Sequence, residues 1–127
     1  MGIQTVIIFT DDDSNYSYIE DADFSLKLYG KSLDETYLNI DLIINKAIEN
    51  NCDAIHPGYG FLSENYEFVK ILEDHKINFI GPSSDLIKKM GDKIEAKKIA
   101  KDLGLPTIKG SDQGVKNIEQ ASKIAET

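Results

Sequence analysis

The segment His56–Asn65 holds the residues of this 127-residue chain that are best suited to bind a small ligand. Within it, Gly58 and Gly60 flank Tyr59. Two glycines beside a tyrosine let the backbone approach a ligand, while the ring offers an apolar face and a hydroxyl. Ser63 can cap the helix that follows and leave backbone amides facing an anion. The alternative is a rigid strand-to-helix turn in which the glycines serve only the backbone.

His56 begins this segment and is a candidate general base or metal ligand. No histidine, cysteine or carboxylate partner stands at metal-like spacing from it, so a turn histidine held by a hydrogen bond is favoured. Pro57 and the glycines after it force a turn. We therefore expect His56, Pro57 and Gly58 to form a structural turn, and we expect no metal site.

The triplet Gly91-Asp92-Lys93 is a second candidate for ligand binding. A lysine in the first turn of a helix faces the positive end of the helix dipole, which costs about 0.5 kcal/mol. A phosphate near this helix end would be attracted both by the lysine and by the free amides of the first turn. Lys93 is therefore a candidate contact for a nucleotide phosphate, and the alternative is a solvated lysine.

Three consecutive carboxylates, Asp11, Asp12 and Asp13, follow the first expected strand. In dinucleotide-binding folds an acidic residue after a strand can hold a ribose hydroxyl, but the glycine-rich turn that this function needs upstream is absent. The triplet also lacks the spacing of a calcium loop. A solvated acidic loop is favoured, and a nicotinamide-binding domain remains as an alternative. The chain has no Walker A loop, C-x-x-C pair or nucleophile elbow.

The hydrophobic pattern predicts strands that alternate with helices. Strands are expected over residues 4–9, 24–28, 54–55 and 77–80, and helices over residues 39–50 and 64–75, from Ser83, from Asp92 to 103 and from Asn117. This order indicates parallel βαβ units and an open sheet with helices on both faces. Ligands bind such sheets at the carboxyl ends of the strands, where the loops at 56–65 and 81–93 are expected.

Composition restricts the classes of function. The chain is 41% hydrophobic and 28% charged, and its length suits one small domain with a single core. A net charge of −8 disfavours a nucleic-acid or anionic-membrane partner, and no run approaches the ~20 apolar residues of a membrane span. The single cysteine, Cys52, cannot form an internal disulfide and is expected to be a small buried hydrophobe. We expect a protein of the cytoplasm or of an organelle matrix.

Three stretches of the sequence carry a family resemblance: residues 53–65, 79–83 (Phe-Ile-Gly-Pro-Ser) and 90–93 (Met-Gly-Asp-Lys). Together they closely resemble the N-terminal domain of biotin carboxylases, the ATP-dependent components of acetyl-CoA, propionyl-CoA, methylcrotonyl-CoA, pyruvate and urea carboxylases. Weaker matches are Thr10–Asp13, Tyr37–Ile40, Gly104–Pro106 and Gly110-Ser111. The resemblance implies a Rossmann-like α/β domain that precedes an ATP-grasp domain, with an open, mainly parallel sheet and flanking helices.

The resemblance also implies roles for individual residues. Lys93 matches the lysine that contacts ATP, and Tyr59 and Gly60 match residues beside the biotin and bicarbonate pocket. The family uses Mg-ATP and bicarbonate to form a carboxyphosphate and then carboxylates biotin on a carrier protein. The catalytic residues of that reaction belong to later domains, so none is expected in this chain.

By the same resemblance, the expected partners are the remaining biotin carboxylase domains, a biotin carboxyl carrier protein, a carboxyltransferase and further copies of the complete protein. ATP, Mg²⁺ and biotin are the implied cofactors. The expected function is that of a fragment of a biotin carboxylase, inactive by itself. The alternative is a non-catalytic α/β interaction module derived from the same fold.

The chain departs from the family pattern at its start and after the first strand. Relatives place another βα unit ahead of the residues that match 4–9, so we expect this chain to lack that first unit. We also expect exposed edges where its central strand would lie. Residues Ser14–Tyr18 stand where relatives have a basic residue and a histidine. The expected organisation is an incomplete N-terminal domain over 1–110 and the start of a connection to an ATP-grasp domain over 111–127.

Overall fold

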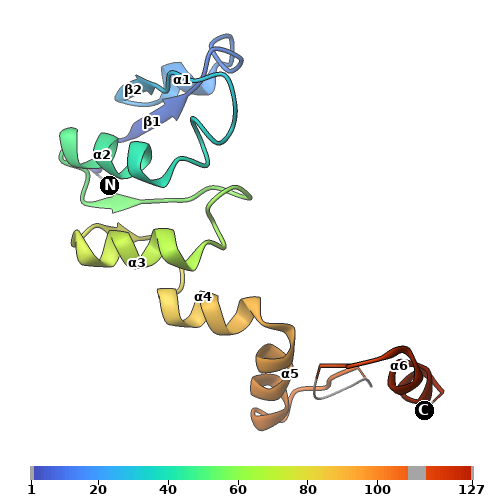
Figure 1. Ribbon diagram of the computed structural model, residues 1–127. Helices are drawn as coiled ribbons and strands as arrows, with labels where there is room; N and C mark the ends of the chain where they lie inside the picture. Colours follow the sequence, from blue (N-terminus) through green and yellow to red (C-terminus); the bar gives the residue numbers. More distant parts are fainter. Residues whose placement is uncertain (1, 109–113, 127) are drawn as a thin grey trace. The chain divides into compact units, whose positions relative to one another are not determined.

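The computed structural model describes residues 2–108 and 114–126. The chain divides into two compact units, Met1–Ser84 and Asp85–Thr127 (Figure 1). The first unit contains, in chain order, β1 (Val6–Phe9), α1 (Tyr18–Asp21), β2 (Phe24–Lys27), α2 (Ile40–Glu49), β3 (Ala54–Ile55), α3 (Tyr66–Asp74) and β4 (Asn78–Phe79). The helices that follow are α4 (Ser84–Gly91), α5 (Lys93–Asp102) and α6 (Ile118–Ala125).

All four strands pair in parallel, but they form two separate sheets. β1 pairs with β2, from Val6 opposite Phe24 onwards, and β3 pairs with β4, with Ala54 opposite Asn78. The predicted α/β class and the parallel pairing are therefore confirmed. The open sheet is interrupted between β1 and β3, because within the described residues no strand joins them.

The hydrogen bonds of β1 show which of its edges is free. The carbonyls of Thr5 and Phe9 accept hydrogen bonds from residues at either end of β2, at 3.0 and 2.7 Å. Because successive residues of a strand point their backbone groups to opposite edges, those of Val6 and Ile8 face away from β2. This edge of β1 pairs with no other strand in the described ranges.

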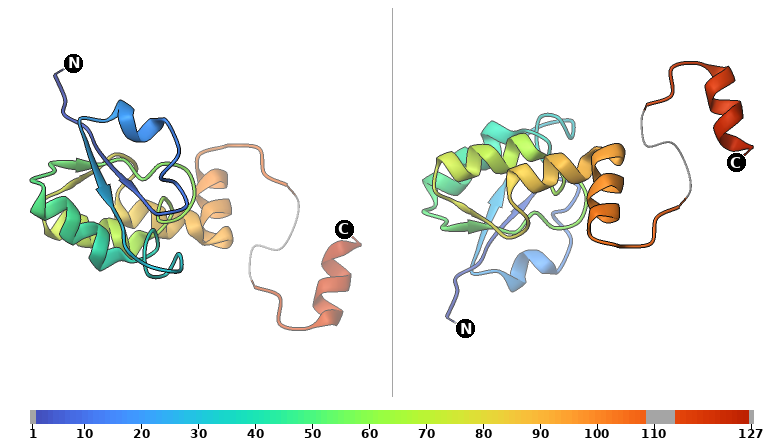
Figure 2. Two further views of the ribbon diagram at one scale, coloured as in Figure 1. Left: turned by 90° about the horizontal axis from the view of Figure 1, so that it is seen from above. Right: turned by 90° about the horizontal axis from the view of Figure 1, so that it is seen from below.

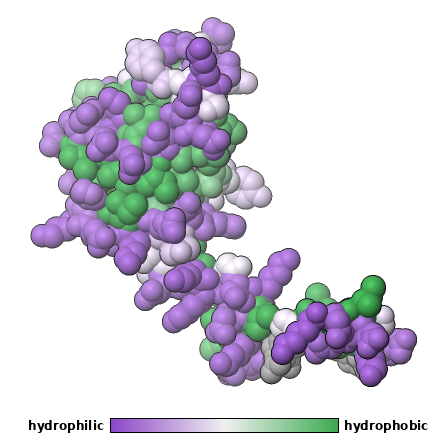
Figure 3. Space-filling view, in the orientation of Figure 1, coloured by the Kyte–Doolittle hydropathy of each residue, from purple (hydrophilic) through white to green (hydrophobic). Residues whose placement is uncertain are grey.

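β3 has a free edge of the same kind. The carbonyls of Asp53 and Ile55 accept from β4 at 2.8 and 2.9 Å, so the backbone groups of Ala54 face the opposite side. The edges of β1 and β3 line one cleft of about 630 Å³, to which Val6 and Ala54 both contribute. In Figure 3, apolar surface gathers in the middle of the first unit, between β1 and β3 as Figure 1 places them. The exposed strand edges that we expected are thus present.

The core of the first unit joins α2 and α3, which lie near each other in both views of Figure 2. The buried residues of these helices are Ile43, Ile44 and Ala47 in α2 and Phe68, Val69 and Leu72 in α3. All six stand on the apolar faces that the helical spacing predicts. Leu72 is completely buried.

The cap of α3 differs from our expectation. Asn65 rather than Ser63 caps this helix, and its side chain accepts the Phe68 amide at 3.0 Å. Asn39 caps α2 in the same way, from the Leu42 amide at 3.0 Å. An asparagine one residue before a helix competes well with a serine two residues earlier, because its oxygen reaches the amide of the third helical residue.

Apart from the buried Ile87 of α4, the described residues of the second unit's helices are exposed or half-buried. Asp92 caps α5 as predicted, and Asn117 caps α6 by accepting the Gln120 amide at 2.9 Å. Gly104 ends the turn after α5 with a φ of +71°. None of the helices in the described ranges is long and apolar enough to cross a membrane. The expected domain boundary at 110/111 and the match at Gly110-Ser111 lie outside the described residues.

Candidate functional site

The turn between β3 and α3 has an unusual backbone. Gly58 and Gly60 have φ angles of +68° and +90°, and Phe61 has a φ of +42°. No protein atom lies within 4 Å of a Cβ built on either glycine, so the need for glycine at these positions is conformational. A bulky residue with positive φ costs about 1–3 kcal/mol, so Phe61 must be held in place by its surroundings.

Hydrogen bonds brace both ends of this turn. The Gly58 amide donates to Nδ1 of His56 at 3.0 Å, which leaves Nε2 to carry the proton of the neutral ring. The Ser63 amide donates to the Gly60 carbonyl at 2.9 Å. Leu62 is buried in the core, whereas the Tyr59 side chain is fully exposed. The turn therefore presents Tyr59 and Gly60 to solvent from a fixed frame.

An aromatic stack, which residue spacing does not predict, adds a third support. The rings of Phe61 and Tyr37 lie parallel, with centroids 5.2 Å apart and 15° between their planes. The Tyr37 hydroxyl donates to Oδ2 of Asp13. That same oxygen accepts the Thr10 amide at 3.1 Å and the Thr10 hydroxyl at 2.7 Å. A chain of contacts thus joins the end of β1 to the turn.

The charges in this chain of contacts shift two pKa values in opposite directions. Hydrogen bonds from Tyr37 and then from Thr10 lower the pKa of Asp13. Burial, followed by the hydrogen bond to the Asp13 carboxylate, raises the pKa of Tyr37 well above its usual value. Tyr37 therefore remains protonated and Asp13 ionised at neutral pH, which is the pairing that the hydrogen bond needs.

The acidic triplet is consequently less solvated than we expected. Asp13 is half-buried and accepts three hydrogen bonds, and Asp11 forms an ion pair with Lys27 of β2. Asp11 and Asp12 are both exposed, as a solvated loop predicts, although Asp11 is paired with a lysine. The difference arises because a tyrosine 24 residues further along the chain folds back onto Asp13, a contact that local spacing cannot reveal.

Lys93 is the first residue of α5 and is exposed, in the second unit. Oδ1 of Asp92 accepts the amides of Ile94 and Glu95, at 2.8 and 3.1 Å. The sequence predicts free amides at this helix end. These two amides are instead occupied and are not free to bind a phosphate. Attraction of an anion to this helix end is left mainly to the Lys93 ammonium group. No protein atom lies within 4 Å of a Cβ built on Gly91, so the approach to the helix is open.

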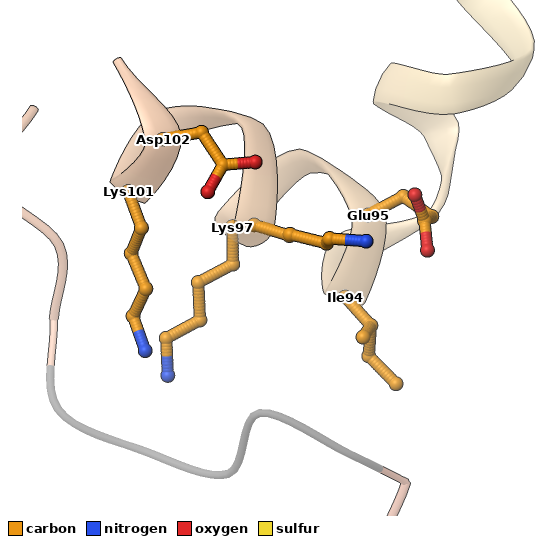
Figure 4. A pocket seen from close by; sticks show the side chains of 6 residues that line it. Ile94, Glu95, Lys97, Lys101 and Asp102 are labelled. Carbon is orange, nitrogen blue, oxygen red and sulfur yellow. The ribbon is translucent and has the colours of Figure 1, made fainter. Parts of the chain in front are cut away.

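The side of α5 also carries a shallow hollow of about 330 Å³ (Figure 4). Its lining combines lysines and carboxylates with one isoleucine: Ile94, Glu95, Lys97, Lys98, Lys101 and Asp102. Mixed charge of this kind is typical of a solvated helix face and does not favour one sign of ligand.

No group of three or more histidine, cysteine, aspartate or glutamate side chains is placed to hold a metal ion in the part of the chain that the structure describes. His56 uses one ring nitrogen in the turn, and the carboxylate of Asp13 is occupied by hydroxyl and amide donors. These described residues do not form a ligand set for Mg²⁺.

The structure brings His56, Pro57, Gly58, Tyr59 and Gly60 together in one braced turn of the first unit, whereas Lys93 begins a helix of the second. Sequence reasoning found all of these residues. It missed Tyr37, Asp13 and Phe61 as supports of the turn. The sequence does show a bulky residue, Phe61, directly after a glycine, but its partner could not be identified from spacing.

Comparison with known proteins identifies the domain. The family described as "Biotin carboxylase, N-terminal domain" matches residues 1–87. The 2-oxoglutarate carboxylase small subunit of Hydrogenobacter thermophilus is 43% identical over 98% of this chain and 26% of its own length. Human mitochondrial pyruvate carboxylase is 41% identical over the whole of this chain and 11% of its own length.

Solved structures agree with these relatives. The biotin carboxylase domain of Hydrogenobacter thermophilus 2-oxoglutarate carboxylase, a dimer in complex with MgADP, ADP and bicarbonate, superposes with a TM-score of 0.90 at 42% identity. The match covers 98% of this chain and 27% of that one. Biotin carboxylase from Campylobacter jejuni gives a TM-score of 0.90 at 40% identity, over 98% of this chain and 28% of that one. This chain therefore spans about a quarter of the Hydrogenobacter thermophilus subunit and of the two solved structures, and 11% of human pyruvate carboxylase; it belongs to the biotin carboxylase N-terminal domain family.

Proposed function

We propose that this chain serves as the N-terminal domain of a biotin carboxylase, which uses ATP and bicarbonate to carboxylate biotin on a carrier protein. The observation that carries the proposal is the braced turn at residues 58–61. It holds a strained backbone in place and projects a fully exposed tyrosine that contributes nothing to the core. Strain that persists without a packing benefit is typical of ligand-binding segments.

Tyr59 and Gly60 are proposed to face the biotin and bicarbonate pocket. The exposed ring and hydroxyl of Tyr59 suit a flat, polar ureido group, which needs both an apolar surface and hydrogen bonds. The open space around Gly60 lets the backbone itself approach the ligand. His56, Pro57 and Gly58 are proposed to keep the turn in shape rather than to contact the ligand, since His56 Nδ1 is used within it.

Lys93 is proposed to contact the phosphates of ATP. Its ammonium group is exposed at the start of α5, beside a glycine that leaves the approach open. The neighbouring Asp92 engages two amides, so the lysine side chain supplies most of the attraction. Magnesium is assigned to no residue of this chain. The metal supplies charge neutralisation to phosphoryl transfer when it is bound.

Among the expected partners, the remainder of a biotin carboxylase fits the free strand edges of the first unit best. The free edges of β1 and β3 line a common cleft, and each presents unpaired backbone groups beside apolar side chains. An extended segment between them would complete a continuous parallel sheet and satisfy both edges. The carrier protein and a carboxyltransferase are proposed as further partners of the assembled enzyme, as is a second copy of it.

A chimeric enzyme tests this function. The matching segment of the Hydrogenobacter thermophilus 2-oxoglutarate carboxylase small subunit would be replaced by this chain, to which it is 43% identical. We expect bicarbonate-dependent ATP hydrolysis that biotin stimulates. A folded chimera without that activity would contradict the proposal and favour a non-catalytic interaction module.

Substitutions in the chimera then separate the two sites. Lys93→Ala is expected to raise the KM for ATP about tenfold, the size of one charge-assisted hydrogen bond, and to leave the KM for biotin unchanged. Lys98→Ala is the matched control, because Lys98 is exposed on the same helix and has no proposed ligand. An equal effect of the two variants would remove the special role of Lys93.

A further inference from the structure

Phe61, Tyr37 and Asp13 form a chain of contacts that reaches from the end of β1 to the turn, and we propose that they are positioning residues for Tyr59. Phe61 stacks on Tyr37, and the Tyr37 hydroxyl binds the Asp13 carboxylate. In this arrangement Asp13 orients the Tyr37 ring, and the ring holds Phe61 in its unfavourable backbone conformation. None of the three needs to touch a ligand.

Burial does not explain the conformation of Phe61. Its side chain is 57% exposed, so the ring gains little from the core, and its φ of +42° is one that bulky residues avoid. The neighbouring Leu62 is buried and anchors the end of the turn. The parallel ring of Tyr37 is the described contact that holds the exposed Phe61 ring in this proposal.

The orientation of Tyr37 is itself over-determined. Three donors converge on Oδ2 of Asp13: the Thr10 amide, the Thr10 hydroxyl and the Tyr37 hydroxyl. The first two fix the carboxylate relative to β1, and the third fixes the tyrosine relative to the carboxylate. A shift of the Tyr37 ring would therefore break a charge-assisted hydrogen bond as well as the stack.

The hold on the turn and the placement of Tyr59 can fail separately. That the contacts hold the turn is a statement about this chain alone. That the held turn positions Tyr59 for biotin rests on the proposed function. The test therefore measures the turn in this chain by amide hydrogen exchange and measures biotin use in the chimeric enzyme.

The amide of Ser63 reports on the turn, because it donates to the Gly60 carbonyl. The amide of Ile77, which donates to the Leu72 carbonyl at 3.0 Å, reports on the core of the same unit. We expect Phe61→Leu to speed exchange at Ser63 about tenfold and Tyr37→Phe to speed it severalfold, with Ile77 unchanged. Equal acceleration at both amides would show a general loss of stability and would overturn the positioning role, as would no change at Ser63.

Asp13 allows a graded test with a matched control. Asp13→Ala is expected to reproduce the effect of Tyr37→Phe, and Asp13→Asn to restore part of the protection, because the amide oxygen can still accept. The control is Asp23→Ala. The Asp23 carboxylate accepts the Thr5 amide and hydroxyl at 2.7 and 3.0 Å, much as Asp13 binds Thr10, but it contacts no ring of the stack. An Asp23→Ala effect at Ser63 equal to that of Asp13→Ala would overturn the proposal.

The chimeric enzyme provides the functional readout. Tyr37→Phe is expected to raise the KM for biotin about threefold to tenfold with kcat and the KM for ATP nearly unchanged, because positioning acts on one ligand. A loosened turn with an unchanged KM for biotin would refute the role of Tyr59 in the proposed function while leaving the geometric part intact. An equal rise in the KM values for ATP and for biotin would overturn the proposal that these contacts position Tyr59.

Discussion

The turn at residues 58–61 and the start of α5 are both candidate binding segments, and they are held in place by different means. The turn depends on Asp13 and Tyr37, which lie far from it in the sequence, and on the adjacent Leu62, which packs in the core. The start of α5 is held locally by Asp92, which caps the two amides that follow Lys93. A binding segment can therefore be built by tertiary contacts or by local capping, and the two respond to different substitutions.

The largest expected effect separates these two kinds of support. Leu72→Ala removes a completely buried side chain and should destabilise the first unit by about 2–5 kcal/mol. Protection of the Ser63 amide should fall with it, since the turn relies on that core. Hydrogen exchange followed by NMR would measure this. The Ala96 amide, which donates to the Asp92 carbonyl within α5 at 2.8 Å, should be affected much less. Equal loss at both amides would break the comparison.

A substitution within the turn should have the next largest effect. Gly60→Ala places a side chain on a backbone with φ of +90° and should cost about 1–3 kcal/mol, measured by urea denaturation. Gly91→Ala is the matched control, because its Cβ also meets no protein atom within 4 Å but stands in helix α4. That control should be neutral or stabilising by up to about 1 kcal/mol. Similar losses for both glycines would mean that the turn is not conformationally special.

The capping of α5 predicts a smaller and local effect. Asp92→Ala should cost about 1 kcal/mol and fray the first turn of α5, seen as faster exchange of the Ile94 and Glu95 amides. Exchange at Ser63 should stay the same. Asp102→Ala, at the other end of the helix, should leave those two amides protected, because the carboxylate that accepts both of them is that of Asp92. Unchanged exchange in Asp92→Ala would show that the cap is not what organises this end.

The smallest expected effect is a dependence on pH. Hydrogen bonds from Tyr37 and Thr10 lower the pKa of Asp13 in the folded chain below its ordinary value of 3.8. A carboxyl group of this kind stabilises the fold above its unfolded pKa, and the contribution is lost as pH falls through the folded pKa. Urea midpoints measured from about pH 5 downwards should therefore fall less steeply in Tyr37→Phe. Tyr16→Phe, a tyrosine stacked on Tyr18 rather than on Phe61, should keep the original slope. Identical slopes of the urea midpoint against pH for the unsubstituted chain and both variants would show that the Tyr37–Asp13 hydrogen bond makes no electrostatic contribution to stability.

The helices show how much of this fold can be predicted from sequence. The buried faces of α2 and α3 follow the apolar spacing at 3.6 residues per turn, and Asp92 caps α5 where the sequence indicated. These features depend on neighbours within four residues, so they can be determined by inspection of a short window. The cap of α3 was expected at Ser63 and lies at Asn65, an error of two residues that is typical of helix ends assigned from a short window.

The strands and the site required the structure. Pairing of β1 with β2 and of β3 with β4 in two separate sheets depends on which edges meet, and short apolar runs carry no information about their partners. In the same way, the sequence predicts that Asp13 is one of three solvated carboxylates, and the structure shows that it accepts a hydrogen bond from the Tyr37 hydroxyl.

The residue types and spacing alone determined the α/β class, the helical faces and the caps of α2, α5 and α6, and they indicated two candidate segments for ligands, because each of these follows from interactions within a few residues. Only the tertiary structure decided that β1 and β3 keep free edges on one cleft and that Phe61 is held by Tyr37 and Asp13. Those features join residues far apart in the chain, and such contacts form only when the backbone brings them within hydrogen-bonding or van der Waals distance.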